Sequence, residues 1–312
     1  MNAQTVCTTQ SSHGITPRAE ADFGSYPGLL ASVGFIALLY LAQSDAAWAA
    51  TAPSLGTENT YAIVSSTFTN GPNVALQTAL TGDVCFTTGP STPPVSSIGT
   101  TTTPCPGQTG VDQGAAISVL NGQSCTFLGP AAIDLNALII GANPPGTIPP
   151  GCYFNGGAMN IVTNTTVTLN GAGVYIFRPG GALTTQANSL VVLAGGACAN
   201  SVFWAPVGAT TLGANAAAST TPTFAGNILD AAGITIGNFA TLTGRALAFG
   251  GTVTTAAVTI SVPTCAPFRA GGGADIPTLS EWAMVMLAAL LAIAGIVVMR
   301  RRTRPFPQTP VH

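Results

Sequence analysis

A short phrase recurs along the second half of this chain and alternates apolar residues with threonine or other small residues. It begins at Leu183, Thr210, Ile234 and Val253, where the sequence reads LTTQAN, TTLGAN, ITIGNF and VTTAAV. The copies are spaced at roughly 20–28 residues, an interval typical of stacked coils that bury their apolar side chains against one another. The repeat therefore predicts a β-solenoid.

The surrounding residues fit this prediction. Residues 158–262 divide into short runs with a period of two, punctuated by Gly, Asn or Pro, which indicates strands buried on one face. Runs of about three to five residues are too short for the hairpins of a sandwich but suit the sides of a coil. Residues 50–157 are less regular, and within them residues 111–120 predict one short helix that ends at Asn121-Gly122.

The front of the chain predicts a secretory leader over residues 1–49. An apolar core at residues 29–42 is followed by Ala47-Trp48-Ala49, a small-x-small pattern that signal peptidase reads, so we expect cleavage after Ala49. The region ahead of the core is long for a signal peptide. The alternative is an uncleaved N-terminal membrane anchor.

The back of the chain predicts a membrane-spanning helix. Residues 283–299 are apolar and uncharged, at the short end of the roughly 17–25 residues that cross a bilayer. Arginines follow at residues 300–304, and because basic residues stay cytoplasmic, we expect the long region before the helix to lie outside and residues 305–312 to form a cytoplasmic tail. The glycine-rich residues 269–275 read as a linker.

Composition excludes several functions. Charged residues make up only 6% of the chain and the net charge is −2, so no basic stripe is available for nucleic acid. The two histidines, His13 and His312, lie near the chain ends, and the carboxylates between the predicted signals are widely dispersed. Because glycosidic cleavage needs two carboxylates held close together, we expect no enzymatic activity, no cofactor and no metal.

Seven cysteines agree with export, since the one at Cys7 would be lost with the leader. The six that remain are Cys85, Cys105, Cys125, Cys152, Cys198 and Cys265. An even number in an oxidising compartment predicts disulfides, although fifteen pairings are possible. The pairing of Cys85 with Cys105, on either side of a loop rich in Pro and Thr, is weakly preferred. No CxxC spacing supports a zinc site.

The C-terminal segment resembles a known sorting signal. Ile276, Pro277, Thr278 and Leu279 begin a motif that ends at Trp282, and the apolar segment and the arginine cluster follow it. This order is similar to the IPTL-type C-terminal sorting signal of Gram-negative bacteria, here over residues 276–304. The resemblance implies that a membrane transpeptidase acts near the motif, and that the protein reaches the cell surface with at least a transient membrane anchor.

The middle of the chain resembles a second family. The stretches that carry this resemblance are residues 149–153, 173–178, 200–204, 209–213, 224–229 and 244–248. They are similar, in the same order, to the ice-binding domain of many cold-living microbes. The resemblance implies an all-β-dominated domain over residues 50–268, built as a right-handed discontinuous β-solenoid with one flanking α-helix, and a flat face that touches ice. The short helix and the cysteines depart from the family pattern.

Threonine suits contact with ice, because its hydroxyl anchors one water and its methyl group excludes the next. On stacked strands such residues stand about 4.8 Å apart. Alternation places these threonines outward as candidates: Thr166, Thr168, Thr210, Thr235, Thr241, Thr243, Thr252, Thr254 and Thr259. Threonine is also a good strand former, so the alternative is a structural or adhesive surface protein without ice activity.

Overall fold

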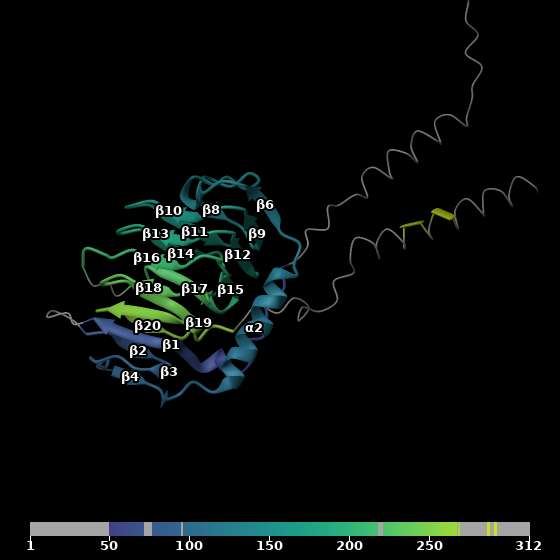
Figure 1. The fold of residues 1–312 in the computed structure, drawn as a ribbon. Helices are drawn as coiled ribbons and strands as arrows, with labels where there is room; N and C mark the ends of the chain where they lie inside the picture. Colours follow the sequence, from purple (N-terminus) through teal and green to yellow (C-terminus); the bar gives the residue numbers. More distant parts are fainter. Residues whose placement is uncertain are drawn as a thin grey trace, which may run out of the picture. The chain divides into compact units, whose positions relative to one another are not determined.

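Short parallel strands stack into three ladders, one on each side of a coiled chain (Figure 1). The computed structural model describes residues 50–71, 77–94, 96–217, 221–266, 268, 286–287 and 290–291. Contacts divide the chain into Met1–Ala47 and Trp48–His312, and all described residues belong to the second unit. Its first described residues, 50–55, form an extended segment that we call the N-terminal strap.

The first ladder, the helix face, lies beneath the α-helix. In stacking order its strands are β6 (Thr126–Gly129), β9 (Gly151–Asn155), β12 (Tyr175–Pro179), β15 (Val202–Trp204), β17 (Phe224–Leu229), the middle of β19 (Thr241–Ala256), the first half of β1 (Tyr61–Gly71), β3 (Asp83–Thr88) and β5 (Thr101–Thr102).

The second ladder, the threonine face, follows the helix face along each coil. Its strands are β7 (Ile133–Asp134), β10 (Met159–Ile161), β13 (Leu183–Thr185), β16 (Thr210–Leu212), β18 (Ile234–Ile236) and the second halves of β19 and β1.

The third face completes the coil. It contains β8 (Thr147–Ile148), β11 (Thr166–Asn170), β14 (Leu190–Ala194), the start of β19, β20 (Thr259–Ser261), β2 (Ala79–Thr81) and β4 (Ser96–Ile98). Among the described residues, the 3-10 helix η1 (Gly56–Thr60) precedes β1, and η2 (Leu135–Ala137) and η3 (Ala199–Ser201) lie between strands.

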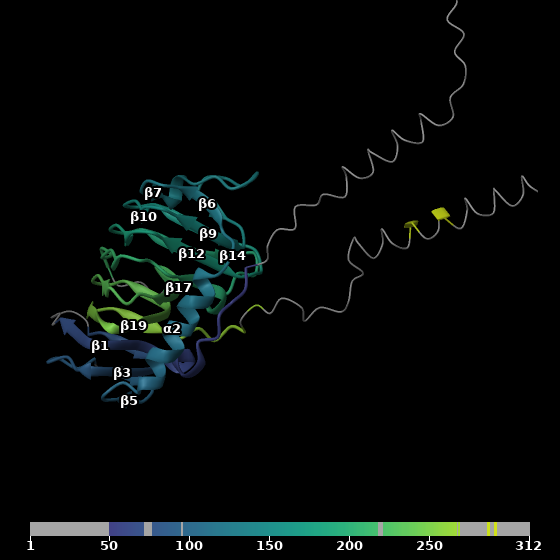
Figure 2. The same cartoon turned by 45° about the vertical axis from the view of Figure 1, so that its right-hand side comes forward.

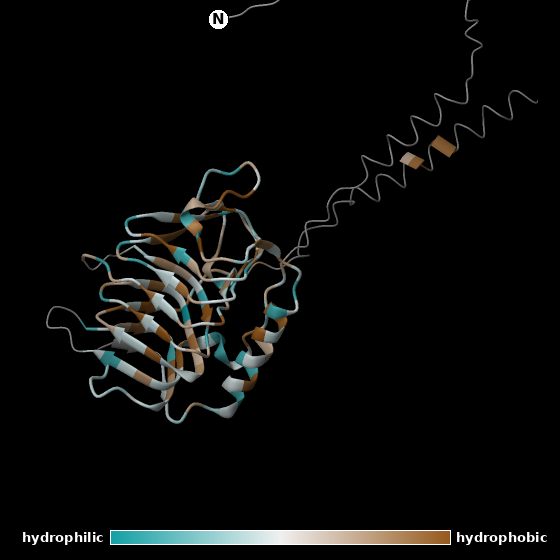
Figure 3. Cartoon of the chain, turned by 45° about the horizontal axis from the view of Figure 1, so that its top comes forward, coloured by the Kyte–Doolittle hydropathy of each residue, from teal (hydrophilic) through white to brown (hydrophobic). Residues whose placement is uncertain are grey.

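The stacking order differs from the chain order, which makes the solenoid discontinuous. Strand β1 pairs in parallel with β19, far along the chain, and β20 lies between β19 and β2. The first strands of the domain therefore extend the stack beyond its last coil (Figure 2). The interior is filled by apolar side chains. Hydrophobic and hydrophilic residues alternate along the strands of the coils (Figure 3).

Aromatic rings on successive coils form a column inside the solenoid. The ring centroids of Tyr153 and Phe177 are 5.6 Å apart, those of Phe177 and Trp204 4.1 Å, and those of Trp204 and Phe224 5.1 Å. The Trp204 indole donates a hydrogen bond to the Ala225 carbonyl, so its one polar group is satisfied inside the core. The column holds the coils in register from the inside.

Helix α2 (Gly107–Asn121) covers the helix face with Ala116 and Leu120 (Figure 1). Its Gln113 side chain is buried, donates to the Leu247 carbonyl and accepts from the Phe249 backbone N–H. The sequence predicted a helix over residues 111–120. The observed helix begins four residues earlier, at Gly107, and this added turn contributes the buried Thr109.

All six predicted disulfide cysteines are paired. Cys85 is joined to Cys105, the pairing preferred from the sequence, and Cys125 is joined to Cys152 and Cys198 to Cys265. Two of these bonds attach the segments just before and just after α2 to the helix face. The third attaches the C-terminal end of the domain to the segment that leads into η3.

The predicted export signals lie almost entirely outside the described residues. This applies to the leader with Ala47 and Ala49, to the sorting motif at Ile276, Pro277, Thr278 and Leu279, and to the arginine cluster. Within the predicted membrane span, residues 286–287 and 290–291 are described and helical. Among the described residues, no helix has the length and apolarity needed to cross a bilayer.

Candidate functional site

One threonine from each of five neighbouring strands forms a straight row on the threonine face. The pairing runs from Thr184 on β13 through Thr211, Thr235 and Thr254 to Thr69 on β1. Thr69, Thr211 and Thr235 are exposed, while Thr184 and Thr254 are half-buried. We call these residues the threonine row.

Backbone pairing fixes the spacing of the row. Adjacent strands lie about 4.8 Å apart, so the hydroxyl and methyl groups repeat at that interval along the solenoid. The branched side chain of threonine is stiff about its first torsion. The Thr69 hydroxyl also donates to the Thr254 hydroxyl at 2.8 Å. The row is therefore a rigid array of alternating hydroxyl and methyl groups.

Two positions beside the row are glycines, which allow close contact between successive coils. Gly213 and Gly237 follow the row on β16 and β18, and a Cβ added at either would come within 2.4 Å of the Gln186 backbone or 2.6 Å of the Ala214 nitrogen. Larger side chains do not fit there. On the other side of the row, Thr67 and Thr252 pair with each other and begin a second row.

Charge is absent along the described row itself. Beyond Thr184, the last residue of the row, strand pairing leads to Asn160 on β10 and then to Asp134 on β7, at the end of the solenoid. The carboxylate therefore stands at the end of this surface and not within it. An uncharged, flat and regularly spaced surface can order a layer of water without holding counter-ions.

The predicted threonines divide among three locations. Thr235 and Thr254 belong to the row and Thr252 lies beside it, whereas Thr166, Thr168, Thr243 and Thr259 are on the third face. The prediction was wrong for Thr210 and Thr241, which are only 1% and 8% exposed. Thr210 points inward and donates to the buried Asp230 carboxylate at 2.6 Å.

Three members of the row were missed: Thr69, Thr184 and Thr211. Each stands in the middle of its strand segment, one residue after an apolar or inward residue. The repeated phrase contained the signal for two of them, because aligning LTTQAN and TTLGAN with ITIGNF by their inward residues selects Thr184 and Thr211.

The third face offers no comparable row. Thr166 and Thr168 on β11 pair with Leu190 and Val192 on β14, so apolar side chains interrupt the hydroxyls. Farther along this face, Thr243 on β19 pairs with Ser261 on β20, which pairs with Thr81 on β2. These hydroxyls span only three neighbouring strands, because Thr81 pairs next with Ile98 on β4.

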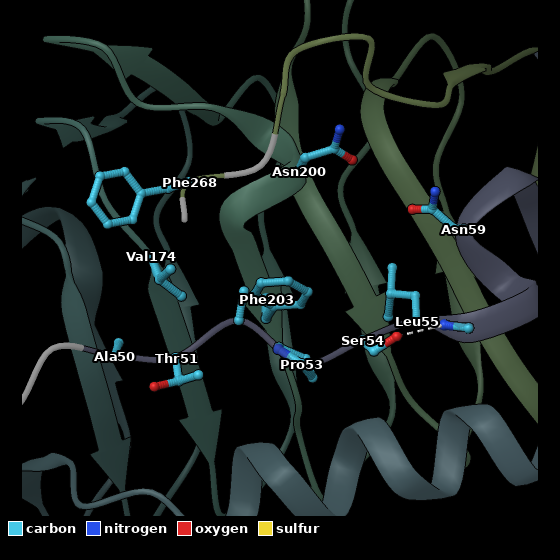
Figure 4. A pocket seen from close by; sticks show the side chains of 12 residues that line it. Ala50, Thr51, Pro53, Ser54, Leu55, Asn59, Val174, Asn200, Phe203 and Phe268 are labelled. Carbon is cyan, nitrogen blue, oxygen red and sulfur yellow. Dashed lines mark hydrogen bonds between the residues drawn. The ribbon is translucent and has the colours of Figure 1, made fainter. Parts of the chain in front are cut away.

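A cavity of about 630 Å³ lies on the helix face, between the N-terminal strap and the strands beneath it (Figure 4). Val174, Phe203 and Phe268 give it an apolar lining, and Asn59 and Asn200 stand at its edge. None of its described lining residues is ionisable. Among the described residues, no group of three or more His, Cys, Asp or Glu side chains is placed to hold a metal ion.

Comparison with known protein families gives two matches. The family model described as ice-binding-like matches residues 42–261, and the IPTL-CTERM motif matches residues 276–302. The second match indicates an exported, cell-surface protein.

Individual relatives agree with the first match. An ice-binding protein of Flavobacterium frigoris (strain PS1) is 36% identical over 121 residues, which are 39% of this chain and 41% of that protein. The alignment thus spans less than half of this curated relative.

Solved structures share the fold. An ice-binding protein from an Antarctic Biological Consortium has a TM-score of 0.57 and 27% identity, covering 69% of this chain and 93% of that one. An ice-binding protein from an Antarctic bacterium of the Flavobacteriaceae has a TM-score of 0.54 and 27% identity, covering 72% and 49%.

Proposed function

Because the chain belongs to the ice-binding-like family, we propose that it adsorbs to ice through the threonine row and the second row beside it. The observation that carries this proposal is the in-register run from Thr184 to Thr69 on five neighbouring strands. Adsorption by this surface would inhibit recrystallisation or attach the protein to ice.

The chemistry of the row supports this proposal. Ice presents a rigid lattice of oxygen atoms, so a binding surface must be stiff and regularly spaced. The parallel ladder supplies both properties, and the methyl groups hold ordered water between the hydroxyls. Because the row has no charged side chain, adsorption does not require the removal of tightly held hydration shells.

The location we propose follows from the two ends of the chain. The leader is removed after Ala49, and residues 283–299 hold the exported domain at the membrane until a transpeptidase acts near residues 276–282. The domain that remains outside spans residues 50–268, followed by the linker at 269–275. The arrangement supplies an ice-binding surface to the outside of the cell.

Substitution of tyrosine at Thr211 or Thr235 tests the proposed surface. Each bulky ring would stand above the flat face and hold its neighbours away from the lattice, so thermal hysteresis and recrystallisation inhibition should fall to near background. Thr259→Tyr is the matched control, because Thr259 is exposed on the third face. Circular dichroism should show that all three variants are folded.

Two outcomes would reject the proposal. If the unmodified protein shows no effect on ice at micromolar concentration, the domain does not use ice as its partner. If Thr259→Tyr abolishes activity while the two row variants retain it, the third face is the binding surface. Inactivity on ice combined with binding to a polysaccharide or to other cells would favour the adhesive function instead.

A further inference from the structure

The C-terminal end of the domain is fastened at one edge of the solenoid by a covalent bond and several hydrogen bonds. The Cys198–Cys265 disulfide joins residues 67 positions apart. The Asn200 amide donates to the carbonyls of Pro263 and Cys265, and the Ser201 hydroxyl accepts from the Phe268 N–H at 2.6 Å. We call this set of contacts the C-terminal clamp.

The clamp is connected to the interior through Arg245. This buried guanidinium donates to the Asn200 side-chain oxygen at 2.8 Å and to the Asn227 side-chain oxygen at 2.7 Å. It also donates to the Asn59 carbonyl. These partners belong to η3, β17 and η1, so a pull on the C-terminal segment is shared among segments from different coils.

Without the clamp, tension on the tail would act first on β20. This strand contains only Thr259–Ser261, and it lies between β19 and β2 at the point where the first strands of the chain join the last coil. Peeling β20 away would break its few backbone hydrogen bonds one after another and open that junction. The disulfide instead directs tension past β20 to Cys198, in the middle of the stack.

The position of the clamp also determines which way the domain faces. η3 lies between β14 on the third face and β15 on the helix face, so the clamp occupies the edge shared by these two faces. In a three-sided coil this edge is opposite the threonine face. The described C-terminal end of the domain therefore lies away from the threonine row.

We propose that the C-terminal clamp is the point through which the tail transmits mechanical tension to the solenoid, so that the anchored chain can hold its cell to ice. The inference rests on the proposed function, because tension arises only if the tail is anchored and the threonine row is held by a surface. The residues that carry it are Cys198, Cys265, Asn200, Ser201 and Arg245.

Single-molecule pulling on the full chain tests the clamp without any ice. One handle is attached at an azide-bearing residue that replaces Thr235 in the row, and the other is attached to a tag inserted in the linker at residues 271–273. With the disulfide intact, we expect no extension step before the solenoid unfolds. In Cys198→Ser/Cys265→Ser, a first step of about 3 nm should appear as residues 259–268 come free, at a lower force than the unfolding of the solenoid.

The matched control is Cys85→Ser/Cys105→Ser, which removes a disulfide of the helix face that lies off the path between the two handles. It should unfold without the early step. Adding a thiol reductant to the unmodified folded molecule should produce the step even if the double variant fails to fold, since Cys265 is exposed.

An unchanged first rupture after loss of the Cys198–Cys265 bond would overturn the proposal, and so would the same early step in the control. Failure of ice adsorption is a separate result, which the tyrosine variants of the row report. If the clamp carries tension but the protein is inactive on ice, the threonine row must attach to a surface other than ice.

Discussion

A carboxyl group is buried in η1, where this short helix meets α2. The Glu58 side chain is fully buried, and neither of its oxygens has a hydrogen-bond partner within the described residues. The pKa of this carboxyl is raised to about 8, first by burial and then by the negative charge of Asp112, while the nearby Arg245 acts in the opposite direction. The folded protein therefore keeps Glu58 protonated at neutral pH, as a neutral acid in an apolar site.

This residue should make the domain less stable as the pH rises. Below about pH 4.5 Glu58 is protonated in both states, whereas between there and about pH 8 only the unfolded chain releases the proton. The contribution is therefore fully present at low pH and lost as the pH rises through the folded pKa. Glu58→Gln should remove this dependence and raise the melting temperature relative to the unmodified protein, increasingly so up to about pH 8.

Thermal melts of both proteins across this pH range measure the effect as a difference. The difference isolates Glu58 from Asp83 and Asp112, whose pKa values are lowered by hydrogen bonds and which act in the opposite sense. A constant difference between the two melting curves would show that Glu58 does not titrate in this range.

Single residues of the candidate site were predictable only where their strand register was clear. Thr235 lies between two isoleucines, and this alternation shows which way it points. Thr210 and Thr211 are adjacent and chemically identical, so the alternation within their own strand does not show which of them points outward. The pairing with β13 and β18 shows that Thr210 is inward and Thr211 outward. A slip of one residue reverses the two faces.

At the scale of elements, α2 is held to the coils by covalent bonds near both of its ends. Cys105 precedes the helix and is bonded to Cys85 on β3, and Cys125 follows it and is bonded to Cys152 on β9. The helix itself contributes only a few apolar side chains to the interface. The disulfides therefore supply stability that its packing does not.

Loss of the first of these bonds should weaken the fold and leave the threonine row intact. The loop closed by Cys85 and Cys105 spans 20 residues, so Cys85→Ser/Cys105→Ser should lower the free energy of unfolding by about 3 kcal/mol. Denaturant titration measures the loss. Because the row lies on a different face, recrystallisation inhibition per folded molecule should not change, and a parallel loss of activity would show that the helix supports the threonine face.

The regular half of the solenoid was largely predictable at this scale. The repeated phrases that begin at Leu183, Thr210 and Ile234 start together with β13, β16 and β18. In each of these strands the two outer residues are buried and the middle one points outward, because each strand crosses a single face. The sequence pattern did not reveal the strands within residues 50–157, notably β1. The register of β1 shifts between Ser65 and Thr67, which breaks the period of two. Its partner β19 lies far away in the chain, and no local pattern reveals such a pairing.

At the scale of the whole domain, function depends on which side of the solenoid is left free. The helix face is covered by α2 and the N-terminal strap, and the C-terminal clamp occupies the edge between the helix face and the third face. Both chain ends of the domain thus lie away from the threonine row. A domain held by its tail can place the entire row flat against a surface.

Attachment geometry tests this arrangement directly. Beads carrying the protein through its tail should adhere to an ice crystal, and so should beads that carry it through an azide-bearing residue at Thr259 on the third face. Beads that carry it through the same residue at Thr235 should not, because the bead surface then covers the row. Adhesion is scored by the fraction of beads that remain on ice under flow at equal protein density. Equal retention of all three would mean that the row is not the contact surface, since only the Thr235 linkage blocks it.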